Sequence, residues 1–150
     1  VSVMPNGNVS GSLNASAGTP LGVGEYREST MARAVSRDGT RVVFTLGAGE
    51  TTTGQLNIRV NADQEQSTMS AGKCTEPDRA CTLRISASDS RYWTASTDGS
   101  KVIYSVGSEF FEFDLQKALA GEPASTLIAA QARGIAGASE DASHIYLVSS

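Results

Sequence analysis

Three segments of the chain repeat one pattern of polar and apolar positions. Residues 34–45, 94–105 and 137–148 align without gaps. Each contains Ser-x-Asp, then Gly or Ala, then Ser or Thr, then a basic residue or histidine, and finally three large apolar residues. The spacing between the aligned serines is 60 and then 43 residues. Self-similarity at this spacing indicates a repeat architecture.

Each of the three segments is expected to form a β-hairpin. Asp38-Gly39 and Asp98-Gly99 lie between strand-like runs and favour a tight type I′ turn, in which both central residues have positive φ. Asp141 is followed by Ala142, whose Cβ disfavours positive φ, so a different or longer turn is expected there. The apolar residues after each turn are consecutive rather than alternating, which predicts strands that are buried on both faces.

A third and a fourth strand are expected after each of the first two hairpins. Alternating patterns at 55–61 and 109–115 predict the third strands, and apolar runs at 82–86 and 125–128 predict the fourth. Four strands in a unit of about 40 to 60 residues are typical of a propeller blade. A β-sandwich or a β-solenoid also gives short strands with regular turns and is the alternative. Only residues 115–120 are compatible with a helical turn.

The Ser-x-Asp-Gly-Ser/Thr-basic-apolar core at residues 36–44 and 96–104 resembles the TolB-like β-propeller repeat of secreted and envelope proteins of the actinobacterial type. The resemblance implies an all-β fold of antiparallel four-stranded blades of an incomplete β-propeller. A closed propeller has typically about 4 to 8 blades. The chain begins at Val1 and is expected to be a piece of a longer protein, with the remaining blades of the same chain as partners. The expected parts are a lead segment or tail of a preceding blade (1–30), blade one with the cysteine loop (31–90), blade two (91–133) and the first hairpin of a third blade (134–150).

The charge balance excludes several classes of partner. Lys plus Arg number 12 and Asp plus Glu number 16, which gives a net charge of −4. This balance lacks the positive charge that proteins use to bind nucleic acid or an anionic membrane surface. No apolar run approaches the roughly 18 residues of a membrane span, so membrane insertion is not expected. No signal peptide is visible at the start of the chain.

The two cysteines, Cys74 and Cys81, are expected to form a disulfide that closes a loop between the third and fourth strands of blade one. Their separation of seven is not a Cys-x-x-Cys motif, and no second pair completes a zinc site. Two buried free thiols are the alternative. A disulfide implies an extracellular or cell-envelope location. The loop is expected to project beyond its neighbours and is a candidate recognition element, with Arg79 as its only anchor of the kind that interface hot spots prefer. A tolerated surface insertion closed by the disulfide is the alternative.

Several residues could suggest catalysis or metal binding, but position argues against each. His144 is the only histidine and aligns with Arg41 and Lys101, so a Ser-His-Asp triad is disfavoured. Each recurring aspartate is alone in its turn, which is too few ligands for calcium and suits a turn-forming role. An acid–base pair among the carboxylates of 109–114 is disfavoured, because these residues are expected at the wet edge of a strand. We therefore expect no enzyme activity, no cofactor and no metal.

Tyr92 and Trp93 precede the inner strand of blade two and are candidate partner-binding residues, although packing between blades is the alternative. The expected function is a non-catalytic binding or scaffold module of an extracytoplasmic protein. TolB-like propellers imply recognition of protein or polysaccharide partners by loops on one face. The alternative is an accessory propeller domain of a larger peptidase or other hydrolase, whose catalytic domain lies outside this chain. A glycan-active enzyme would need paired inward carboxylates, where the inner strands offer Ala, Ser and Thr.

Overall fold

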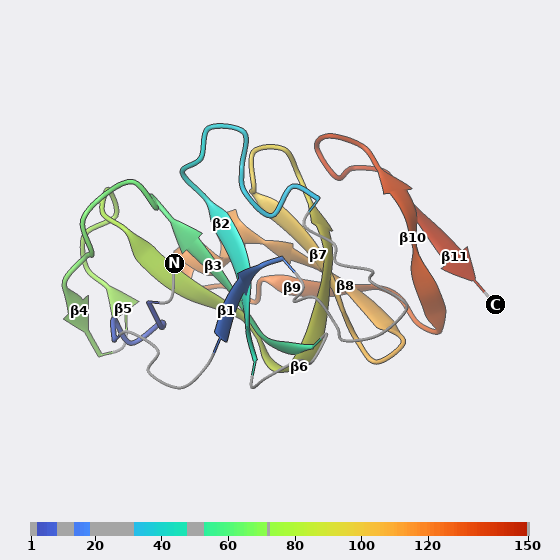
Figure 1. Ribbon diagram of the computed structural model, residues 1–150, viewed down its shortest axis with the longest axis horizontal. Helices are drawn as coiled ribbons and strands as arrows, with labels where there is room; N and C mark the ends of the chain where they lie inside the picture. The colour runs from blue at the N-terminus through green and yellow to red at the C-terminus, as the bar shows by residue number, and fades with distance from the viewer. Residues whose placement is uncertain (1–2, 9–13, 19–31, 48–52, 72, 150) are drawn as a thin grey trace.

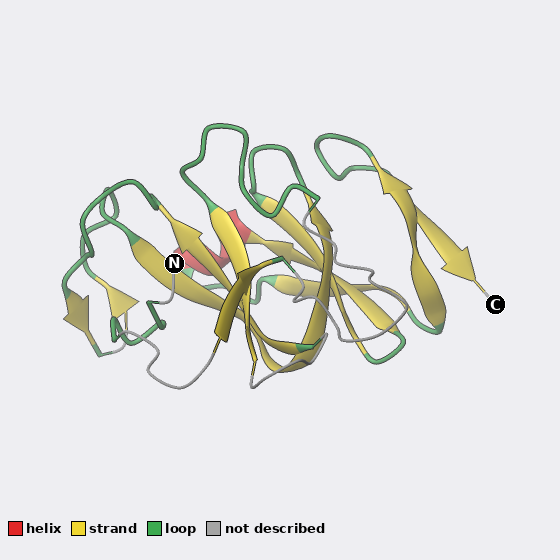
Figure 2. Cartoon of the chain, in the orientation of Figure 1, coloured by secondary structure: helices red, strands yellow, loops and turns green. Residues whose placement is uncertain are grey.

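The chain folds as antiparallel β-sheet with one short helix (Figures 1 and 2). The computed structural model describes residues 3–8, 14–18, 32–47, 53–71 and 73–149. The expected all-β class is confirmed, and of the segment 1–30 only the first two of these ranges are described. The strands are β1 (Asn14–Ala17), β2 (Val42–Gly47), β3 (Gly54–Val60), β4 (Met69–Ser70), β5 (Lys73–Cys74), β6 (Cys81–Ala95), β7 (Lys101–Val106), β8 (Glu109–Asp114), β9 (Ser125–Ala129), β10 (Ala132–Ala138) and β11 (Ile145–Ser149). The helix α1 is Leu115–Ala120.

The main sheet has seven strands in the order β1-β2-β3-β6-β7-β8-β9, all paired antiparallel. Its centre is β6, a 15-residue strand. The first part of β6, Cys81–Ser90, pairs with β3, and the last part, Ser90–Ala95, pairs with β7. One strand therefore serves as the last strand of the first unit and the first strand of the second.

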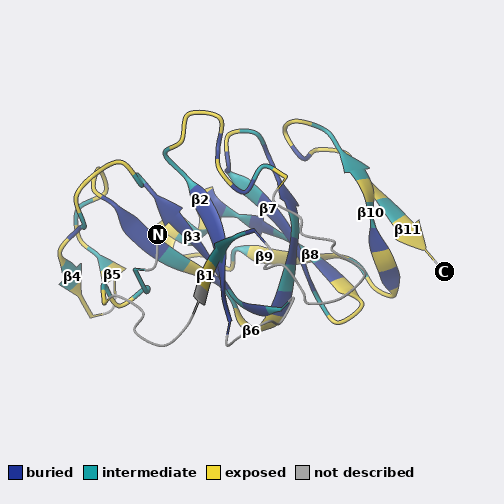
Figure 3. Ribbon diagram, viewed as in Figure 1, coloured by how far each residue is buried: buried dark blue, intermediate teal, exposed yellow. Residues whose placement is uncertain are grey.

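The two halves of the sheet share one hydrophobic core. Val43, Leu56 and Ile58 come from the first half, while Val102 and Phe113 come from the second. These residues belong to one buried cluster, so both halves pack on a common core, and buried residues are drawn dark blue in Figure 3. The apolar run of β2 is buried at every position, as the unbroken pattern of the sequence predicts.

The expected hairpins form, but their turns are not of type I′. In the first, the Ser36 N–H donates to the Arg41 carbonyl at 2.9 Å and the Gly39 N–H donates to the Ser36 carbonyl at 2.9 Å. Gly39 has a φ of +75°, whereas Asp38 is not among the residues with positive φ. The loop is thus a type I turn followed by one left-handed residue, which is the form that four-residue hairpin loops commonly take.

The third hairpin contains the same turn, so the expectation of a different or longer turn at Ala142 is wrong. The Ala142 N–H donates to the Ser139 carbonyl at 3.1 Å, and the Ser139 N–H donates to the His144 carbonyl at 2.9 Å. Ala142 has a φ of +55°. The hydrogen bonds of the turn hold an alanine in a conformation that glycine adopts more readily.

Strands β10 and β11 form a separate two-stranded sheet at one end of the molecule (Figure 1). Tyr146 and Val148 on β11 are 66% and 45% exposed. Within the described residues, β11 pairs only with β10, which leaves its other edge without a strand neighbour.

Candidate functional site

The disulfide expected between Cys74 and Cys81 is confirmed, with a Cα–Cα distance of 6.0 Å. It closes the end of the long connection between β3 and β6. Inside this connection, the short strands β4 and β5 pair at Met69↔Cys74 and Ser70↔Lys73. The bridge therefore ties the β4–β5 hairpin to the first residue of β6.

The polar side chains of this connection hold it in shape. The Glu76 carboxylate accepts from the Thr68 N–H at 2.8 Å and from the Thr68 hydroxyl at 3.0 Å, and these bonds lower the pKa of Glu76. Arg79 forms ion pairs with Glu65 at 2.7 Å and with Glu76 at 3.3 Å. The Asn61 amide donates to the carbonyls of Pro77 and Arg79 at 2.8 and 3.1 Å. Arg79, expected as a recognition anchor, is thus engaged within the loop.

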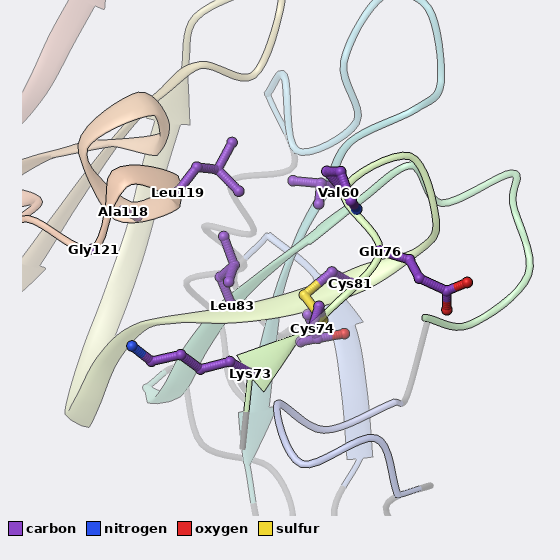
Figure 4. Close-up of a pocket in the computed structure, with 11 residues that line it drawn as sticks. Val60, Lys73, Cys74, Glu76, Cys81, Leu83, Ala118, Leu119 and Gly121 are labelled. Carbon is purple, nitrogen blue, oxygen red and sulfur yellow. A yellow bond between two sulfur atoms is a disulfide. The ribbon is translucent and has the colours of Figure 1, made fainter. Parts of the chain in front are cut away.

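A groove of about 400 Å³ lies between the disulfide loop and α1 (Figure 4). Its lining is mostly apolar, with the disulfide on one wall and Leu119 on the other, and Lys73 among its polar residues. The Leu119 side chain is 55% exposed. The lining residues are Val60, Lys73, Cys74, Glu76, Pro77, Cys81, Thr82, Leu83, Ala118, Leu119 and Gly121.

The helical wall of the groove is fixed at both ends. At its start, Asp114 accepts from the backbone N–H groups of Gln116 and Lys117 at 2.9 and 3.3 Å. At its end, Gly121 has a φ of +76°, and its N–H donates to the carbonyl of Ala118 at 3.1 Å. This is the usual pattern of a side-chain N-cap and a left-handed C-cap. It holds a helix of only six residues, and the helix presents Leu119 to the groove.

The two candidate aromatic residues have different environments. Tyr92 is 0% exposed, and its hydroxyl donates to the Ala32 carbonyl at 2.6 Å. Burial raises the pKa of Tyr92. This side chain belongs to the core and is not available to a partner.

Trp93 instead lines a second cavity of about 250 Å³, together with Arg91, Phe110 and Arg133. Its indole N–H donates to the Ser105 hydroxyl at 2.9 Å, and the Arg91 guanidinium lies 4.3 Å from the ring centroid. The Phe110 ring centroid is 5.4 Å from that of Trp93. The indole is therefore packed among its neighbours at the cavity wall.

The recurring aspartates each organise their own turn. Asp38 Oδ1 accepts from the Ser36 hydroxyl at 2.6 Å and from the Thr40 N–H at 3.1 Å. These bonds lower the pKa of Asp38 to about 2. Asp98 and Asp141 accept equivalent bonds. In the part of the chain that the structure describes, no group of three His, Cys, Asp or Glu side chains is placed to hold a metal ion.

The three turns lie side by side and are joined by backbone hydrogen bonds. The Arg37 N–H donates to the Thr97 carbonyl at 2.9 Å, and the Thr97 N–H donates to the Glu140 carbonyl at 2.6 Å. The Arg41 guanidinium reaches the Asp98 carbonyl at 2.6 Å. The turns thus form one continuous row along an end of the molecule (Figure 1).

His144 is not arranged as part of a triad. Its Nδ1 lies 2.9 Å from the Ser143 hydroxyl, but that same hydroxyl donates to Asp141 at 2.8 Å. In a catalytic triad, the aspartate instead orients the histidine and the serine proton goes to the histidine. All three side chains are exposed, so the cluster is part of the turn.

Two of the three carboxylates of β8 are engaged in structural contacts. Glu112 pairs with Lys101 at 3.2 Å, and Asp114 caps α1. The sequence indicates a helical turn at 115–120, but nothing in its pattern shows that this turn would lie across a groove from the disulfide loop. Asp114 and Gly121, which flank the six residues of the helix, are the sequence signal for its bounds.

Comparisons of the chain with protein-family models, with curated proteins and with solved structures give no significant match. Among the described residues, no helix has the length and apolar character needed to cross a bilayer.

Proposed function

We propose that the chain is a non-catalytic binding or scaffold module, built from antiparallel blades of an incomplete β-propeller in an extracytoplasmic protein. The groove between the disulfide loop and α1 is the observation on which the binding role depends. A cavity of 300 to about 1,000 Å³, lined mainly by apolar side chains with a few polar groups, is typical of ligand sites. The disulfide supports the oxidising location.

The repeated hairpins support the propeller interpretation. Two units of antiparallel strands follow one another, and their turns lie in one row joined by backbone hydrogen bonds. The open edge of β11 and the exposed side chains of Tyr146 and Val148 suit the addition of further strands. On this proposal, the remaining blades of the same protein cover them, and the groove binds a protein or polysaccharide partner.

The binding role is tested with two libraries, one of random peptides displayed on phage and one of arrayed glycans. We expect the chain to enrich ligands from one library, and Leu119→Arg to abolish this binding because it places a charge across the groove. The matched control is Leu127→Arg, since Leu127 on β9 is similarly exposed at 51% and does not line the groove. Equal binding by both variants, or no enrichment from either library, would contradict the proposal.

A further inference from the structure

We propose, building on the binding function above, that the occupant of the groove is an extended peptide of a partner protein that ends in an apolar residue with a free C-terminal carboxylate. The groove combines three properties that together select such a ligand: an apolar lining, an exposed lysine in that lining and walls that are fixed in advance.

The apolar lining indicates that the main part of the ligand is apolar. Val60 and Leu83 project into the groove from the sheet, and Leu119 projects from α1 (Figure 4). Leu119 is more than half exposed, so an apolar ligand would remove its side chain from water. A volume of about 400 Å³ accommodates two side chains of the size of leucine or phenylalanine.

The charged residues of the groove indicate which group the end of the ligand carries. The Glu76 carboxylate is bonded to Thr68 and paired with Arg79, which also pairs with Glu65, so Glu76 is engaged within the loop. Lys73 lines the groove and is exposed, and no carboxylate of the described residues lies within ion-pair distance of its amine. An apolar ligand that ends in a carboxylate complements this arrangement.

The fixed walls favour binding by lowering its entropic cost. The disulfide, the Asn61 amide and the Glu76 carboxylate hold one wall, while the two caps of α1 hold the other. A preformed site loses less conformational entropy when it binds a ligand.

A fatty acid shares the apolar body and the carboxylate, but it fits the polar part of the lining less well. The lining includes Glu76 and Thr82, and Gly121 lies on the helical side of the groove (Figure 4). An acyl chain would lay methylene groups on these polar atoms, which is unfavourable when they lose water without gaining hydrogen bonds. A peptide main chain brings N–H and C=O groups to the same place.

The experiment is an NMR titration of the ¹⁵N-labelled chain with the peptide acetyl-Gly-Ser-Gly-Ser-Leu-Leu, as the free acid and as the C-terminal amide. We expect the free acid to shift the resonances of the groove residues and the amide to bind about fivefold more weakly. Lys73→Gln should weaken the acid about fivefold and leave the amide unchanged, whereas Lys73→Arg should retain the preference for the acid. Lys117→Gln is the control, because Lys117 lies on α1 but does not line the groove.

The other outcomes contradict the peptide proposal, and each also shows whether the broader binding function survives. Equal affinity for acid and amide would remove the carboxylate from the argument, while the binding function stands. Groove shifts with dodecanoate but not with either peptide would assign the site to an acyl ligand. If glycans bind at the groove and the peptides do not, the peptide proposal fails and the binding function survives. If neither a library ligand nor the peptide binds, the peptide proposal and the binding function both fail.

Discussion

The stacking of the turns can be measured by adding one methyl group to two equivalent glycines. Gly39 and Gly99 occupy the same position in the first and second turns, with φ of +75° and +70°. A Cβ on Gly39 would meet no atom within 4 Å. A Cβ on Gly99 would lie 3.1 Å from the Arg41 Cβ and 3.4 Å from the Ser36 Cβ, which belong to the neighbouring turn. The pair therefore separates the cost of the backbone conformation from the cost of the contact between turns.

For Gly39→Ala, we expect a loss of about 1 kcal/mol in the free energy of unfolding, which is the cost of the left-handed conformation. For Gly99→Ala, crowding against a Cβ that cannot move without its backbone adds about 1 to 2 kcal/mol. For a chain of this length, each kcal/mol lowers the Tm by roughly 2 to 4 °C. Gly99→Ala should thus lower the Tm by roughly 4 to 12 °C, and Gly39→Ala by roughly 2 to 4 °C.

Urea unfolding followed by circular dichroism, with a thermal melt of each variant, measures both values. The slope against urea concentration must be unchanged for the comparison to report stability alone. Ala142→Gly is the reverse test in the third turn, since it relieves the positive φ but removes a buried methyl group worth about 0.8 kcal/mol. With about 1 kcal/mol gained from the relieved conformation and about 0.8 kcal/mol lost with the methyl group, this variant should be close to neutral. Equal losses for Gly39→Ala and Gly99→Ala would refute the close stacking of the turns, and no loss in either would refute the left-handed conformation.

Three further predictions concern the carboxylates, the disulfide and the exposed hairpin. The folded-state pKa of Asp38 is lowered to about 2, so its contribution to stability is present above about pH 4 and is lost as the pH falls toward 2. The free energy of unfolding in urea should therefore depend less on pH between about 4 and 2 in the variant Asp38→Asn than in the unaltered chain. Replacing Cys74 and Cys81 by serine should cost about 2 kcal/mol or less in urea unfolding, since the loop that they close is short; a loss well above this value would mean that the bridge does more than restrict the unfolded chain. Because Tyr146 and Val148 are exposed on one edge strand, we expect the chain to self-associate in analytical ultracentrifugation. The double variant Tyr146→Lys, Val148→Lys should reduce this association, and an unchanged sedimentation profile would exclude the hairpin as the contact.

The sequence predicted the local structure of the repeats well, because short-range signals determine it. The Ser-x-Asp pattern located the hairpins β6–β7 and β10–β11 and the turn before β2, where the preceding segment pairs through the single bridge Val35↔Val42. The unbroken apolar run at Val42–Phe44 predicted a strand that is buried on both faces, whereas the same expectation is wrong for the run in β11, which has no buried residue. The type of turn was missed, because Asp-Gly occurs both in type I′ turns and in longer loops where only the glycine has positive φ.

The candidate site was only partly predictable, because it depends on contacts between distant segments. The disulfide pairing followed from there being two cysteines. The other wall of the groove is formed by α1, about 40 residues after the disulfide loop in the sequence. No local sequence pattern predicts that these two segments lie next to each other. Tyr92 and Trp93 are adjacent in sequence, yet one lies in the core and the other lines a cavity; Trp93 lies where the pairing of β6 with β7 shifts register, which the sequence pattern did not show.

The continuous strand β6 determines how the molecule can come apart. Repeat units are usually joined by loops, so that one unit can open while its neighbour stays folded. In this chain, no loop separates the first two units, since Ser90 pairs with β3 on one side and with β7 on the other. Fraying that starts at β3 is carried along β6 directly into the ladder of β7. The two units are therefore expected to protect their amide hydrogens from exchange as one body, while the β10–β11 hairpin, with its separate ladder, exchanges by an opening of its own.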